Sequence, residues 1–79
     1  MVFARLPEDL LEILRFIYEH NALGSKPNYS DVRQELSISK PTVGKRIKVL
    51  INTGYVTENS RDRSKVLELT YKGMRLFLK

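Results

Sequence analysis

The chain has 79 residues, of which 42% are hydrophobic, and a formal net charge of +5. A chain this short supports one small core, so we expect a single domain over residues 1–79, with no room for an enzyme cleft and a lid. Its composition excludes a disordered tail, its apolar runs are too short for a membrane span, and the absence of cysteine excludes disulfides and thiolate zinc sites.

The charge is unevenly distributed along the chain. Residues 1–38 hold four basic and six acidic side chains, which sum to −2, whereas residues 39–79 hold ten basic and three acidic ones, which sum to +7. A basic surface concentrated in one half favours a polyanionic partner, of which nucleic acid is the commonest and an anionic membrane surface a weaker alternative. A generic solubilising charge is the competing interpretation.

The first expected helix begins around Pro7 and ends near residues 20–21. Proline fits the first turn of a helix, and the carboxylates of Glu8 and Asp9 favour the positive end of the helix dipole. His20 is the only histidine, and we expect a capping or surface role for it, because a lone histidine lacks the partners of a metal or catalytic site. The apolar face of this helix consists of Leu10, Leu11, Ile13, Leu14, Phe16 and Ile17.

A break at residues 24–28 separates this helix from a helix-turn-helix pattern. We expect Ser30 to cap the second helix, which then runs from Asp31 to about Leu36 and is followed by a tight turn at residues 37–38. The third helix is expected over residues 39–53, with Ser39 as its N-cap and Gly54 as its left-handed C-terminal cap.

A hairpin and a last helix complete the expected elements. Tyr55 and Val56 resume as a strand, residues 59–65 form a polar and charged hairpin tip, and residues 66–69 form the returning strand. Thr70 caps a last short helix that ends near Leu78. This order predicts an α+β fold, a winged helix-turn-helix with a three-helix core, a β-hairpin wing and a short C-terminal helix.

The third helix separates an apolar face from a cationic one. Four bases without an acid are unusual on an exposed helix, where mixed signs normally form i,i+4 pairs. Since the second helix of a helix-turn-helix lies in the major groove, its N-terminal residues are expected at base edges. The expected base-reading residues are Ser39, Lys40, Thr42 and Lys45, Pro41 lies in the same exposed first turn, and Lys48 and Arg46 are expected to hold phosphates.

Two residues of the expected interface have alternative interpretations. Gly44 either allows the helix backbone to approach DNA closely or is merely tolerated at a modest cost in stability. Ser30 either clamps a phosphate, together with the free N–H groups of its helix, or only caps that helix.

The wing carries the remaining candidates, Arg61, Arg63 and Lys65. In a winged domain such a tip reaches the adjacent minor groove or its phosphates, and arginine suits a narrow minor groove because the negative potential is deepest there. The alternative is a solvated hairpin tip without a partner.

The chain resembles the winged helix-turn-helix regulators of the multiple-antibiotic-resistance-regulator type and related small archaeal DNA-binding proteins. The resemblance implies sequence-specific binding of double-stranded DNA through residues 39–48 and the wing, and a role in transcriptional control. The chain differs from larger members in lacking long terminal dimerisation helices. The residues that carry the resemblance cover about half the chain in the right order: residues 39–43, Leu50, residues 54–56, residues 61–63 and residues 69–73.

We therefore expect a non-enzymatic regulator without cofactor or small-molecule ligand. A homodimer is favoured because two half-sites raise specificity. The N-terminus has no secretory signal, so a cytoplasmic, nucleoid-associated protein is expected. A nonspecific architectural DNA-binding protein and a winged protein-interaction module are the rival interpretations. The terminal apolar residues expected to meet a second copy, unless they only close the core, are Phe3, Leu6, Leu76, Phe77 and Leu78.

Overall fold

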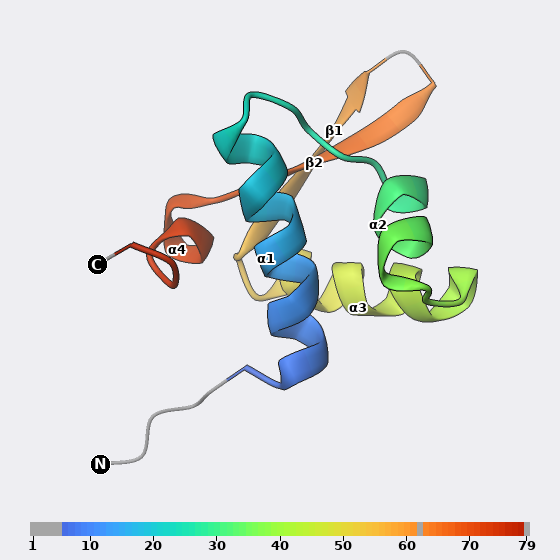
Figure 1. The fold of residues 1–79 in the computed structure, drawn as a ribbon, viewed down its shortest axis with the longest axis horizontal. Coiled ribbons are helices and arrows are strands. Elements are labelled where there is room, and N and C mark those ends of the chain that lie inside the picture. Colours follow the sequence, from blue (N-terminus) through green and yellow to red (C-terminus); the bar gives the residue numbers. More distant parts are fainter. Residues whose placement is uncertain (1–5, 62, 79) are drawn as a thin grey trace.

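The computed structural model describes residues 6–61 and 63–78. Its elements follow the order α1 (Glu8–Ala22), α2 (Tyr29–Leu36), α3 (Lys40–Asn52), β1 (Val56–Arg61), β2 (Ser64–Leu69) and α4 (Tyr71–Met74). The two strands form an antiparallel hairpin. Figure 1 shows α2 and α3 on one side of α1, α4 on the other, and the hairpin projecting beyond the helices. The predicted winged helix-turn-helix fold is confirmed.

The core is formed where α1, α2 and α3 meet the base of the hairpin. The four buried residues of α1 recur at intervals of three and one, which places them on one face of the helix. In the hairpin, Val56 pairs with Leu69, and Leu67 lies two residues along β2, so all three point to the same side of the sheet. The buried core residues are Leu10, Ile13, Leu14, Ile17, Val32, Val43, Ile47, Leu50, Val56, Leu67 and Leu69.

The N-cap of α2 differs from the prediction. Asn28, not Ser30, caps this helix: its side chain accepts a hydrogen bond from the Asp31 backbone N–H at 2.8 Å, and the Asp31 carboxylate accepts one from the Asn28 N–H at 3.0 Å. This reciprocal capping box satisfies two backbone donors, whereas a cap at Ser30 would satisfy one. The helix therefore begins two residues earlier than predicted, and Ser30 lies in its first turn.

The hairpin is longer and more regular than the prediction of a loop over residues 59–65. Backbone pairing continues through Asn59 with Val66, Ser60 with Lys65 and Arg61 with Ser64. The side chains of these residues are polar, so the sequence shows no alternation of apolar residues that would predict a strand. The hydrogen bonds of a strand pair involve only the backbone, and a strand that is solvated on both faces can therefore still form.

The C-terminal helix is shorter than predicted and ends at Met74 instead of near Leu78. Beyond it, the N–H groups of Leu76 and Phe77 donate to carbonyls three residues earlier, as in turns, and the Leu78 N–H donates to the Met74 carbonyl four residues earlier. Thr70 caps the helix as predicted, since its hydroxyl accepts from the Gly73 N–H. The ring of Phe77 then stacks on that of Tyr18, with centroids 4.8 Å apart, and holds this end of the chain against α1.

Hydrogen bonds from two segments of the helical part of the domain attach to the second strand of the hairpin. Near the end of α1, the amide of Asn21 accepts from the Leu69 N–H at 2.9 Å and donates to the Leu67 carbonyl. Before α2, the Pro27 carbonyl accepts from the Leu67 N–H at 2.8 Å, where the loop between α1 and α2 crosses the hairpin (Figure 1). The position of the wing is thus set by contacts with two separate segments.

Candidate nucleic-acid interface

The third helix has the two faces that the sequence predicts. Val43, Ile47 and Leu50 are buried against the core, whereas Ile51 is only half-buried. On the opposite side the exposed residues are Lys40, Pro41, Lys45, Lys48, Val49 and Asn52. No acid lies on this helix, and its bases lie between Lys40 and Lys48, so its exposed face is cationic except in the last turn.

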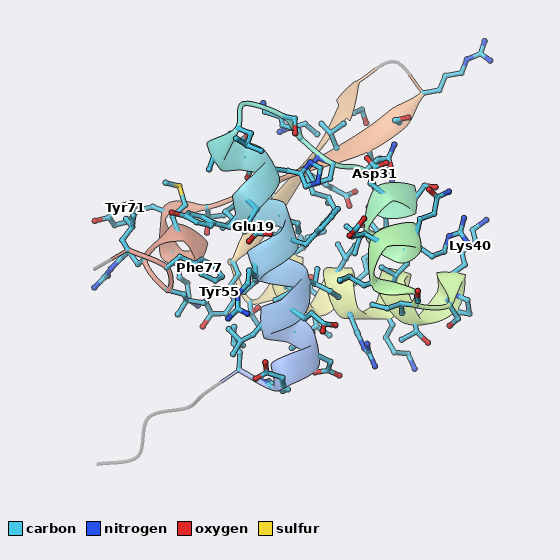
Figure 2. The ribbon with its side chains drawn as sticks, viewed as in Figure 1. Glu19, Asp31, Lys40, Tyr55, Tyr71 and Phe77 are labelled. Carbon is cyan, nitrogen blue, oxygen red and sulfur yellow. The ribbon has the colours of Figure 1, made fainter. Side chains whose placement is uncertain are left out.

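The first turn of α3 contains four of the predicted contact residues. Ser39 is the N-cap, as predicted, but its hydroxyl makes no capping bond and instead donates to the Thr42 hydroxyl at 2.8 Å. Thr42 is half-buried, while Lys40 and Pro41 are exposed. Figure 2 shows Lys40 beside α2, on the side of the molecule away from Tyr71 and Phe77. The cationic first turn therefore faces outward.

A hollow of about 490 Å³ lies between α2, the first half of α3 and the wing. We call it the basic groove. It brings together residues far apart in the sequence, including five predicted contact residues: Ser30, Lys40, Gly44, Lys48 and Lys65. The other residues that line it are Tyr29, Arg33 and Val43.

Two residues of the basic groove, Tyr29 and Arg33, were missed at the sequence level. Arg33 lies one turn after Ser30 on α2, so the i,i+3 spacing places both on one face of that helix. This signal was present in the sequence once the start of α2 was known. The prediction starts the helix at Asp31, so it does not place Tyr29 and Ser30 on the same helix as Arg33.

A second, shallower hollow continues the basic groove along the wing. It is lined by Asn28, Tyr29 and Ser30 from the start of α2 and by Arg63, Ser64 and Lys65 from the tip and second strand of the wing. Arg63 is exposed at the turn. Arg61 ends β1 and pairs in register with Ser64. The wing tip and the first turn of α2 thus lie next to each other.

Arg46 and Lys45 lie outside the basic groove. The guanidinium of Arg46 forms an ion pair of 3.4 Å with the Asp9 carboxylate at the start of α1. This contact places Arg46 on the flank of α3 that faces α1, where both side chains are partly exposed. Lys45 is exposed on the outer surface of the helix. A partner that reached both residues would have to extend across α3.

Gly44 has open space around it. A Cβ atom built at this position would meet no heavy atom within 4 Å, apart from the helix's own nearby backbone. Packing within the chain therefore does not require glycine here. Of the two interpretations of Gly44, close approach of an external molecule remains compatible with this geometry, and so does simple tolerance of glycine in an exposed helix.

One carboxylate lies at the edge of the basic groove. Glu58 of β1 accepts a hydrogen bond from the Tyr29 hydroxyl at 2.5 Å and forms an ion pair with Lys65 at 3.5 Å. The hydrogen bond from Tyr29 lowers the pKa of the Glu58 carboxyl, Lys65 and Lys48 lower it further, and burial opposes them. Burial, together with the bond to Glu58, raises the pKa of the Tyr29 phenol.

The predicted terminal apolar cluster is only partly exposed. Leu76 and Leu78 are exposed, Leu6 and Phe77 are half-buried against the core, and Phe3 lies outside the described residues. Met74 and Tyr71 add further exposed apolar surface near the chain end.

His20 interacts only locally, with its ring Nδ1 3.0 Å from the Ser25 hydroxyl. Among the described residues, no helix is long and apolar enough to cross a membrane.

Comparison with known proteins identifies the architecture. No family model matches the chain, and no curated protein matches its sequence significantly. Among solved structures, the chain is similar to MepR, a transcription regulator of the Staphylococcus aureus multidrug efflux pump MepA, with a TM-score of 0.84, 21% identity and coverage of 90% of this chain and 52% of that one. MepR has also been solved in complex with DNA.

Two further structures have higher sequence identity. Staphylococcus aureus MarR, in complex with salicylate and kanamycin, matches with a TM-score of 0.79, 29% identity and coverage of 91% of this chain and 47% of that one. AF1382 from Archaeoglobus fulgidus matches with a TM-score of 0.82, 25% identity and coverage of 90% and 78%. The resemblance found in the sequence is thus confirmed at the level of the fold, and the chain spans about half the length of the first of these regulators.

Proposed function

We propose that the chain is a sequence-specific double-stranded DNA-binding protein that acts in transcriptional regulation. The observation that carries the proposal is the basic groove, where cationic residues from α2, α3 and the wing converge on one surface. Double-stranded DNA carries regularly spaced phosphate charges, so several phosphates can contact a cationic surface of this kind at once. The MepR complex with DNA supports this partner for the fold.

In the proposed complex, α3 lies in the major groove and the wing reaches the minor groove or its phosphates. Ser39, Thr42 and Lys45 contact base edges. Lys40, expected from the sequence at a base edge, lines the basic groove with Lys48 and Ser30, and we place these three at phosphates. Arg46 would exchange its carboxylate partner Asp9 for a phosphate oxygen. Arg61, Arg63 and Lys65 supply the positive charge of the wing. Gly44 allows the helix backbone to approach the duplex closely.

The proposal needs no catalytic step and no cofactor. The protein would act by occupying its DNA site, where it either excludes other proteins or positions them. We place it with other regulators among the nucleoid-associated proteins of the cytoplasm, and we propose that residues 1–79 act as one DNA-binding domain.

The test is fluorescence anisotropy with a duplex from upstream of the protein's own gene and with a scrambled duplex, over a series of salt concentrations. Regulation by specific binding requires a preference of about 1,000-fold or more for a native duplex at physiological salt. Equal and steeply salt-dependent binding to both duplexes would indicate an architectural protein. Absence of binding to either at low salt would contradict DNA binding and favour a protein-interaction module.

Lys45→Ala should weaken binding to the cognate duplex about tenfold, with little effect on a random duplex, because a base-edge contact contributes roughly 1–3 kcal/mol of discrimination. The measurement is the same anisotropy titration with both duplexes. Lys26→Ala is a matched control, since Lys26 pairs with Glu68 and does not lie on α3. Equal losses on both duplexes would show that Lys45 contacts only phosphate.

We also propose a homodimer formed through the terminal apolar residues. Leu76 and Leu78 expose apolar side chains, and a second recognition helix would extend the DNA site to two half-sites. Sedimentation equilibrium should then give twice the mass of the chain, and Leu76→Ser with Leu78→Ser should return it to the monomer mass. A wild-type chain that stays monomeric at high concentration, with and without DNA, would refute the dimer.

A further inference from the structure

Glu58 is an acid placed among bases on the inner face of the wing. Side chains alternate along β1, so Glu58 points to the same side of the hairpin as the buried Val56. Across the hairpin, Glu58 pairs with Leu67, and Lys65 lies two residues from Leu67 on that same face. The inner face of the wing therefore changes from apolar at its base to charged where it borders the basic groove.

The Glu58 carboxylate connects the DNA-facing elements. One oxygen accepts from the Tyr29 hydroxyl of α2, and the other pairs with the Lys65 ammonium of β2. The hydrogen bond from Tyr29, followed by the charges of Lys65 and of Lys48 on α3, lowers the pKa of the Glu58 carboxyl, which is therefore ionised at neutral pH. Its side chain is only 22% exposed, whereas that of Lys65 is 58% exposed. The Lys65 ammonium of this ion pair therefore faces solvent, and the Glu58 carboxylate lies beneath it.

This arrangement reduces the charge that the basic groove offers to phosphates. A lysine paired with a carboxylate gains less from a phosphate, because the phosphate must compete with the existing partner and is repelled by it. Binding to random duplex depends almost entirely on phosphate contacts, whereas cognate binding also uses base contacts. An internal negative charge therefore removes a larger share of the binding free energy from a random complex than from a cognate one, which also has base contacts.

We infer that Glu58 is a counter-charge within the DNA interface, whose negative charge limits sequence-independent binding by holding Lys65 and opposing phosphates in the basic groove. This inference rests on the proposed function, since it assigns a role within the DNA interface. It differs from a purely structural role for Glu58. If Glu58 only held the wing in place, its removal would loosen the wing and weaken DNA binding. If Glu58 is a counter-charge, its removal strengthens DNA binding.

Glu58→Gln is the test variant, because glutamine keeps an oxygen that can accept from Tyr29 but removes the charge. With a random 20-base-pair duplex in 0.1 M salt, we expect binding about three- to tenfold tighter than wild type, because Lys65 becomes free to neutralise one more phosphate. The slope of log K against log salt should become steeper by about 0.9 for the same reason. Thermal unfolding of each variant establishes that it is folded.

Two variants separate this effect from simpler ones. Glu68→Gln removes the same charge from the other face of the hairpin, where Glu68 pairs with Lys26 at 3.6 Å, and should change affinity and slope much less. Tyr29→Phe removes the hydrogen bond but keeps the carboxylate and its lysine, and should leave the slope unchanged. The inference predicts a steeper slope for Glu58→Gln alone.

Three outcomes would overturn the inference. Equal increases in affinity for Glu58→Gln and Glu68→Gln would mean that only the net charge matters. Unchanged or weaker binding by folded Glu58→Gln, with wild type binding the duplex normally, would refute the counter-charge and leave the proposed function intact. If wild type binds no duplex even at low salt, the proposed function fails, and the role of Glu58 fails with it.

Discussion

Replacement of Gly73 by alanine should destabilise the protein by about 3 kcal/mol, because the added methyl group overpacks a buried contact. A Cβ atom at this position would clash with the Tyr55 carbonyl oxygen and would lie 3.3 Å from the carbonyl carbon. Both atoms belong to backbone, so a change of rotamer cannot relieve the clash. At the scale of small domains, this loss corresponds to a Tm lower by roughly 12 °C or more.

The clash occurs where several interactions join α4 to the turn between α3 and β1. The Tyr55 carbonyl accepts from the Thr70 N–H at 3.0 Å, and the Thr70 hydroxyl donates to the Gly54 carbonyl. Lys72 donates to the Thr53 carbonyl at 2.7 Å and lies over the Tyr55 ring. Moving α4 away from Tyr55 would disturb all of these bonds together, so a small local shift of the backbone cannot relieve the clash.

Gly44→Ala is the matched control for this experiment. Both glycines lie in helices, but the Cβ at position 44 meets open space, so this alanine should stabilise the protein by about 0.5–1 kcal/mol through helix propensity. Thermal and urea unfolding of both variants give the comparison. A Gly73→Ala protein as stable as wild type would show that the contact between α4 and the turn before β1 is not tightly packed.

Replacement of Lys40 and Lys48 together by alanine should weaken duplex binding by about 60-fold in 0.1 M salt. Each neutralised phosphate adds about 0.9 to the slope of log K against log salt, which amounts to roughly eightfold per lysine between 1 M and 0.1 M salt. Both lysines are exposed and line the basic groove from α3. The slope itself should fall by about 1.8.

The control for the double variant removes the same net charge from a distant surface. Lys26 and Arg75 are both exposed, and neither lines the basic groove. Their joint replacement by alanine should reduce affinity by much less than the double lysine variant does, because charges beyond a Debye length of about 10 Å are largely screened. Similar losses in the two double variants would mean that binding depends on net charge and not on the basic groove.

The sequence by itself determined the order and type of the elements. The spacing of the apolar residues in α1 and α3, Pro7 and Pro41 near the starts of helices, and Gly54 at a helix end are local signals, and the structure follows them. The cationic outer face of α3 was also predictable, because rotation around a single helix places its side chains without knowledge of the rest of the chain.

Some errors were local as well. The cap of α2 was assigned to Ser30 although the pattern of Asn28 with Asp31, three residues apart, encodes the capping box. The strands were predicted too short because the outer half of the hairpin carries polar side chains on both faces. A ladder held by backbone hydrogen bonds leaves no periodic apolar pattern when neither face is buried.

Only the tertiary structure decided which charged residues act together. Lys48, Lys65, Arg33 and Tyr29 come from three separate elements, and folding brings them to one groove. Tertiary packing also turned Arg46 towards Asp9 and placed Glu58 beneath Lys65. The physical reason is that secondary structure depends on neighbours within a few residues, whereas the pairing of charges depends on how the buried faces of distant elements orient them.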